Sequence, residues 1–172
     1  SFPTRRSSDL NLLMPKLRRV HFASIGWPDA RLSPLSLDLA DDLGGATDSV
    51  LWLRNGGGKS SILNLFFSTF RPGLSDFLGR AVEGQRRHLA DYVAADDSAF
   101  VLTEWELDGP VTTPRTLVVG QSLEWRDRAK SADPSRLHRR FFSFFTDEAL
   151  GWRSIPVQAL SEQPCTTQEA FV

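Results

Sequence analysis

The residues with the clearest chemical meaning lie at positions 51–67, in the stretch LWLRNGGGKSSILNLFF. Gly56, Gly57 and Gly58 stand together there and are followed directly by Lys59. Glycine has no Cβ, so consecutive glycines let backbone N–H groups approach a bound anion closely and adopt dihedral angles that other residues avoid. The spacing predicts a loop that holds phosphate groups at the start of a helix.

The side chains beside the glycines complete the predicted site. Lys59 is expected to reach the β- and γ-phosphates of ATP, the Ser60 hydroxyl to coordinate Mg²⁺, and the Ser61 N–H to lie near the α-phosphate. The general pattern G-x-x-x-x-G-K-[ST] has glycine where this chain has Leu53. An ordinary glycine turn before Lys-Ser is the alternative. The predicted ATP-binding residues are Asn55, Gly56, Gly57, Gly58, Lys59, Ser60 and Ser61, with Ser60 as the Mg²⁺ ligand.

Two flanking elements must position this loop. Residues 50–53 form an unbroken apolar run, which is typical of a strand buried on both faces of an α/β sheet. After the loop, apolar residues recur at helical spacing up to Phe70, and Arg71 followed by proline and glycine ends the pattern. The motif therefore predicts a strand, a glycine loop and a helix, in that order.

The rest of the chain is mostly strand-like. Alternating apolar and polar residues predict strands on both sides of the motif, and those that follow it form an antiparallel meander. The expected strands are residues 17–25, 35–39, 99–107, 116–125 and 139–145, with a short polar helix within 83–97. The predicted fold class is α/β: a phosphate-loop NTPase lobe with an antiparallel β-subdomain, as one domain.

This layout resembles the N-terminal head lobe of the structural maintenance of chromosomes (SMC) ATPases, most closely the MukB-type and Wadjet-type condensins. The resemblance is carried by MPKLRRVHFASIGW from Met14, by NGGGKSSIL from Asn55, and by the stretches VLTEWELDG and RTLVVGQSLEW. It extends over about residues 14–157, and the glycine loop is its specific part. Leu53 departs from the family pattern as it does from the general one.

The resemblance implies a function and a set of partners. In that family the N-terminal lobe joins a C-terminal lobe of the same protein across a long coiled coil, and ATP is sandwiched between two heads, here expected to be two copies of one protein. The Walker B acids and the signature motif then belong to the C-terminal lobe, so no catalytic residue is assigned here. The implied role is ATP binding in a machine that acts on DNA in organisation, segregation, repair or plasmid defence, with accessory subunits unassigned.

The composition of the chain limits the partners and the cellular compartment that we expect for it. A net charge of −1 gives no overall basic field, so contact with DNA would need a local patch such as Arg80, Arg86 and Arg87. The single Cys165 cannot form an internal disulfide, and the histidines are spaced unlike zinc ligands, which favours a reducing cytoplasmic setting. The apolar runs are too short to span a bilayer, so no membrane partner is expected.

The two ends of the chain are expected to be non-native boundaries. Residues 2–10 correspond to the translation of a common sequencing adapter, so residues 1–13 are assigned to a tail outside the fold. The native start is expected at Met14, the only methionine. Residues 14–172 are then a nucleotide-binding lobe that is incomplete at its C-terminus.

Several residues support rival interpretations. Glu104 or Asp147-Glu148 would act as Walker B acids in a self-sufficient small NTPase or kinase, although their positions favour solvated carboxylates. Gln121 is a candidate for a glutamine that links Mg²⁺ to a moving lobe. The favoured interpretation is that Gln121 is an ordinary mid-strand residue on a half-exposed sheet. The aromatics of residues 141–145 are interpreted as core. A non-catalytic module, in which nucleotide only orders a partner surface, is a further alternative.

Overall fold

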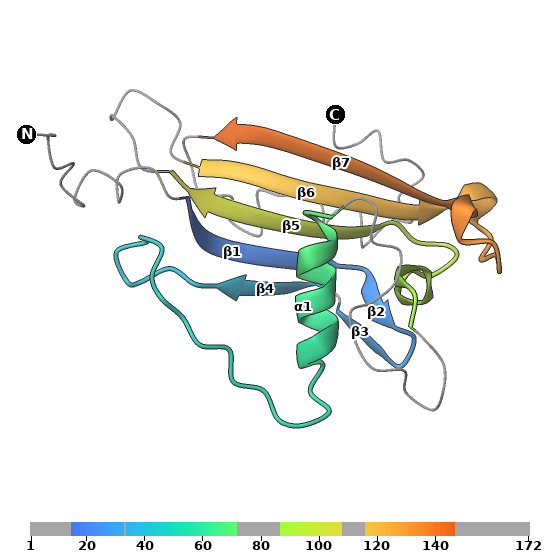
Figure 1. The fold of residues 1–172 in the computed structure, drawn as a ribbon, viewed down its shortest axis with the longest axis horizontal. Coiled ribbons are helices and arrows are strands. Elements are labelled where there is room, and N and C mark those ends of the chain that lie inside the picture. Colours follow the sequence, from blue (N-terminus) through green and yellow to red (C-terminus); the bar gives the residue numbers. More distant parts are fainter. Residues whose placement is uncertain (1–14, 33, 72–86, 108–115, 147–172) are drawn as a thin grey trace, which may run out of the picture.

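The computed structural model describes residues 15–32, 34–71, 87–107 and 116–146. Its centre is a five-stranded sheet in the order β4-β1-β5-β6-β7, in which each neighbouring pair is antiparallel (Figure 1). The strands are β1 (Lys16–Ala23), β4 (Leu35–Asp38), β5 (Ala99–Glu106), β6 (Thr116–Trp125) and β7 (Leu137–Thr146). The strands expected from the alternating pattern, including the meander β5-β6-β7, are thereby confirmed.

A small hairpin extends from the end of β1. Its strands, β2 (Ile25–Trp27) and β3 (Ala30–Leu32), pair antiparallel around a two-residue turn. Ser24 has a left-handed backbone with φ of 52°, which separates β2 from β1. Gly26 has φ of 143°, and a Cβ there would lie 2.7 Å from the Ala30 carbonyl oxygen. The strand expected at residues 17–25 therefore ends at Ala23, and the sequence assigned no strand to residues 26–32.

Helix α1 (Lys59–Ser68) packs on one face of the sheet, across the strands (Figure 1). Ile62 and Leu65 of α1 are buried in a cluster that includes Val20, Phe22 and Val101 from the sheet. The helix begins directly after the glycines, as predicted. Shorter 3-10 helices lie at Leu89–Tyr92, Arg126–Arg128 and Pro134–Arg136, and the first of these replaces the polar helix expected within residues 83–97, of which 83–86 lie outside the described part.

The prediction of a buried strand before the glycines is wrong. Residues 50–53 form no strand, and the side chains of Val50 and Trp52 are 90% and 88% exposed. An apolar run predicts a doubly buried strand only where neighbouring strands exist, and no strand in the described ranges pairs with this one. These ranges therefore form an antiparallel sheet covered by a helix. The assignment to a phosphate-loop lobe stays a prediction.

No helix in the described ranges is both long enough and apolar enough to cross a bilayer.

Candidate phosphate-binding site

The glycine loop has the backbone geometry that three adjacent glycines suggest. Gly56 and Gly58 are left-handed, with φ of 82° and 83°. Gly57 is crowded instead, because a Cβ at that position would lie 2.9 Å from the Arg54 carbonyl oxygen, to which its own N–H donates. Leu53, at the position where the general pattern has glycine, packs its side chain against the core. The loop is therefore anchored at Leu53, while its tip is formed by residues without a Cβ.

Lys59 lies over this loop. Its Nζ donates hydrogen bonds to the carbonyl oxygens of Leu53 at 2.7 Å and Arg54 at 3.0 Å. A lysine ammonium has three N–H donors, so these two bonds hold the charge at the loop and leave a third donor for an anion. Local sequence is enough to predict this position, because Lys59 follows the loop immediately.

The N-terminus of α1 points its positive dipole end at the same place. Gly58 caps the helix without a side-chain hydrogen bond, and the first turn holds no acidic residue among the residues the structure describes. The first N–H groups of a helix lack partners within the helix, which makes such an end favourable for anions. Ser60 is exposed here, and the Ser61 Oγ lies 3.3 Å from the Tyr92 hydroxyl.

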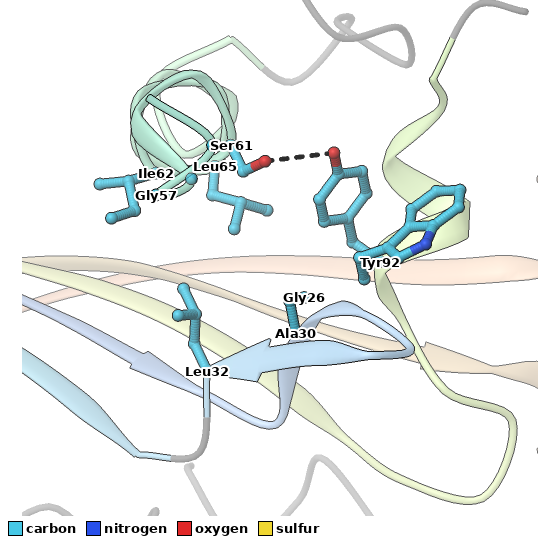
Figure 2. A pocket seen from close by; sticks show the side chains of 11 residues that line it. Gly26, Ala30, Leu32, Gly57, Ser61, Ile62, Leu65 and Tyr92 are labelled. Carbon is cyan, nitrogen blue, oxygen red and sulfur yellow. Dashed lines mark hydrogen bonds between the residues drawn. The ribbon is translucent and has the colours of Figure 1, made fainter. Parts of the chain in front are cut away.

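Two adjoining cavities open at the loop. The polar one has a volume of about 470 Å³ and is lined by Asn55, Gly56, Gly58, Lys59, Ser60 and Ser61 together with Trp27, Ala30 and Arg87. The apolar one, of about 300 Å³, lies between α1 and the β2–β3 hairpin with Tyr92 at one side (Figure 2). The structure thus brings six of the seven predicted residues to the polar cavity, and the seventh, Gly57, lines the apolar one.

Three residues that the sequence did not assign to the site also lie at these cavities. The Trp27 ring meets the Tyr92 ring edge-on at 5.8 Å between centroids, and the Arg87 guanidinium lies 5.5 Å from the Trp27 ring centroid. Arg87 Nη1 also donates to the Tyr92 hydroxyl at 3.4 Å. The sequence singled out Arg87 only as a candidate for contact with DNA. Trp27 and Tyr92 join the loop only through tertiary packing, so no local pattern could have identified them.

Glu104 is neither a solvated carboxylate nor part of this site. It is fully buried, with Oε1 2.6 Å from His21 Nε2 and Oε2 3.5 Å from Arg19 Nη1. Its neighbour Trp105 contacts Phe66 of α1, so alternation along β5 places Glu104 on the opposite face of the sheet. The expectation of a solvated side chain fails because an alternating pattern does not reveal whether the second face of a sheet is also covered.

Gln121 is also buried, which corrects the expected half-exposed position. Its Nε2 donates to Ser68 Oγ at 2.6 Å and Thr69 Oγ1 at 3.1 Å, and its Oε1 accepts from Arg139 Nη2 at 2.9 Å. Burial lowers the pKa of the Arg139 guanidinium from its ordinary value. Ser68 and Ser60 are roughly 12 Å apart along α1, at 1.5 Å per residue. Gln121 therefore holds the far end of the helix and does not reach the predicted Mg²⁺ ligand.

The other residues that the sequence analysis singled out are either exposed or lie outside the described residues. The phenylalanines of residues 141–145 were expected in the core, but Phe141, Phe144 and Phe145 are exposed on the edge strand β7. Asp147, Glu148, Arg80, Arg86, Cys165 and the tail at residues 1–13 lie outside the described residues. The described residues contain no group of three or more His, Cys, Asp or Glu side chains placed to hold a metal ion.

Comparison with known proteins adds no relative. No protein-family model, no curated protein and no solved structure matches this chain. The glycine loop and its two adjoining cavities are therefore the features of this chain that point to a function.

Proposed function

We propose that this chain binds ATP with its phosphates on the glycine loop at the start of α1. One observation carries the proposal: a loop of two left-handed glycines and one crowded glycine leads into a helix end without an acidic residue or a side-chain cap, beside Lys59. Backbone N–H groups, the helix dipole and the lysine charge all favour a polyphosphate there. The polar cavity of about 470 Å³ gives that group room.

Magnesium fits the same arrangement in part. The exposed Ser60 lines the polar cavity and offers one hydroxyl oxygen, as the motif predicts. No carboxylate lines that cavity in the described ranges. In such sites Mg²⁺ keeps several water ligands and binds phosphate oxygens of the nucleotide. Ser60 would therefore supply one protein ligand, and the nucleotide and water would supply the others. Any acidic ligand would come from residues outside the described ranges or from another part of the assembled protein.

The wider role that we propose is that of the ATP-binding N-terminal half of an SMC-like head. The order of elements supports it, because β1, the glycine loop, α1 and the antiparallel pair β5–β6 follow one another as in the family that the sequence resembles. The partners proposed on this basis are a C-terminal lobe of the same protein, a second copy as the opposing head, and DNA, in the cytoplasm. The process would be DNA organisation, segregation, repair or plasmid defence.

A second candidate is a nucleotide-dependent interaction module. The exposed apolar side chains of Leu51 and Trp52 line a cavity together with Lys59, beside the loop. A nucleotide that draws Lys59 away from the carbonyls of Leu53 and Arg54 would alter this segment directly. In this candidate ATP orders the segment for a partner and is not consumed.

The test of nucleotide binding is a calorimetric titration of Mg·ATP into the full chain and into Lys59→Ala. Loss of a charge-assisted contact of about 1.5–3 kcal/mol weakens affinity roughly tenfold to a hundredfold. Lys130→Ala is the matched control, because Lys130 is also exposed and does not line any of the cavities at the loop. Equal ATP affinity in the native chain and in Lys59→Ala would refute the site.

A further inference from the structure

The apolar cavity beside the loop is lined mainly by glycines and by aliphatic and aromatic side chains. Ala30 and Leu32 from the hairpin face Ile62 and Leu65 from α1 across it (Figure 2). Its volume of about 300 Å³ is enough for a flat heterocycle. It shares Trp27, Ala30, Gly56, Gly58 and Ser61 with the polar cavity, so the two cavities adjoin along one side of the loop. Their combined shape suits a molecule with a polyanionic part joined to a flat, largely apolar part.

Trp27 is placed to hold such a ring. Its side chain remains 43% exposed and lines both cavities, although Tyr92 and Arg87 contact it. A fixed indole offers a large flat surface for stacking at low cost in conformational entropy, and nucleobases stack on such rings regardless of their identity. The contacts with Tyr92 and Arg87 fix this indole beside the glycine loop.

The polar side chains of the apolar cavity have little capacity to read a base. Among the described residues they are the hydroxyls of Ser61 and Tyr92, 3.3 Å apart, and the indole N–H of Trp27, whose side chain is 43% exposed. Adenine has an amino donor at C6 where guanine has a carbonyl acceptor, and guanine has an additional amino donor at C2. Strong discrimination requires buried groups that only one base satisfies, whereas a hydroxyl both donates and accepts.

The geometry points to a nucleobase subsite in the apolar cavity, in which a purine stacks on Trp27 and is not distinguished as adenine or guanine. This inference rests on the proposed function, because the phosphates of the same nucleotide occupy the glycine loop. It adds that affinity comes from the phosphates and from stacking, and that the site accepts purine nucleoside triphosphates as a class.

The experiment titrates Mg·ATP, Mg·GTP and Mg·tripolyphosphate into the full chain and its variants. In the native chain we expect ATP and GTP affinities within about threefold of each other, and tripolyphosphate about tenfold weaker because it lacks the stacking ring. Trp27→Ala weakens ATP and GTP about tenfold and leaves tripolyphosphate unchanged. Trp27→Phe retains most of the affinity, since it keeps a flat ring. Phe145→Ala, an exposed aromatic on β7, is the control and changes nothing.

The outcomes separate this inference from the proposed function. ATP binding that depends on Lys59 but not on Trp27 overturns the base subsite and leaves the phosphate site standing. A preference for ATP over GTP greater than about tenfold overturns the lack of discrimination. ATP binding that is indifferent to both Lys59 and Trp27 overturns the two proposals together. Unchanged tripolyphosphate affinity in Trp27→Ala shows that the variant is folded at the loop, and Trp27→Phe provides the test if Trp27→Ala does not fold.

Discussion

At the residue scale, the three glycines of the loop are required for different reasons. Gly56 and Gly58 have open space around the position of a Cβ, so only their left-handed backbone favours glycine. Gly57 has no left-handed backbone, but a Cβ would press on the Arg54 carbonyl oxygen at 2.9 Å. Substitution at Gly58 therefore costs backbone strain, and substitution at Gly57 costs a displacement of the loop.

The effect of backbone strain is measurable at Gly58. We expect Gly58→Ala to lower the free energy of unfolding by about 1 kcal/mol, the cost of a left-handed residue with a Cβ. Gly58→Asn should lose less, because asparagine tolerates this region. Gly45→Ala is the matched control, since Gly45 has no left-handed φ and its nearest contact would be Asp41 at an ordinary 3.6 Å. Equal urea midpoints for Gly58→Ala and Gly45→Ala would contradict the argument.

The sequence identified the residues whose roles depend on their neighbours along the chain. The glycines, Lys59 and Ser60 form one contiguous loop, so their spacing alone predicts their proximity. Trp27 lies far from this loop in sequence and reaches it only because the β2–β3 hairpin stands beside α1. Glu104 was misinterpreted because its burial depends on the face of the sheet opposite α1. Tertiary contacts of this kind leave no local pattern.

At the element scale, α1 is held at both ends by different chemistry. Its first turn continues from the glycine loop, while its last turn is bound to the sheet by Gln121 from β6. Arg139 from β7 also donates to the Ser68 carbonyl oxygen at 2.9 Å. These contacts fix the C-terminal end of the helix, so movement at the loop would be accommodated at the N-terminal end.

The contribution of Gln121 can be isolated with a double-mutant cycle. Gln121→Leu should lower the free energy of unfolding by about 2 kcal/mol, because it leaves buried polar groups of α1 without this partner. Ser68→Ala should cost less, since it removes one of the contacts. The coupling energy between the two changes is expected near 1 kcal/mol for a direct 2.6 Å hydrogen bond. Additive effects in denaturant unfolding would show that the bond contributes no coupling.

The strands that the sequence predicted share a pattern of apolar and polar residues. Apolar and polar residues alternate over much of β1, β4, β5, β6 and β7, and that alternation is visible in the sequence, although β5 is buried on both faces from Ala99 to Glu104. The run at residues 50–53 carries no alternation, so its assignment depended on the expected glycine motif. No described strand lies beside it, and Val50, Leu51 and Trp52 are exposed while Leu53 packs against the core.

At the scale of the whole molecule, the proposed phosphate site would need further groups to cleave a bound nucleotide, because no carboxylate lines the polar cavity among the described residues. Phosphoryl transfer depends on positioned groups that stabilise charge and orient water. The polar cavity presents Lys59 and Arg87 but no carboxylate among the described residues, and Glu104 lies across the sheet. We therefore expect this chain to bind ATP and to release phosphate no faster than the background rate.

This expectation is checked by steady-state phosphate release from the purified chain, alongside Glu104→Gln and Asp147→Asn. Neither substitution should alter the rate, since Glu104 does not reach the loop and the family resemblance places the catalytic acids in another lobe. Asp147 lies outside the described residues, so its variant tests the sequence-based alternative alone. Turnover clearly above background that either substitution abolishes would instead establish a self-sufficient NTPase.

The position of β1 between β4 and β5 has a consequence for the order of folding. β5, β6 and β7 are joined by short connections along the chain and pair in sequence order, whereas His21 of β1 meets Glu104 of β5 across 83 residues. Closing a longer loop costs more chain entropy before any contact compensates for it, and distant strand pairs slow folding. The meander is therefore expected to form before β1 pairs with β5.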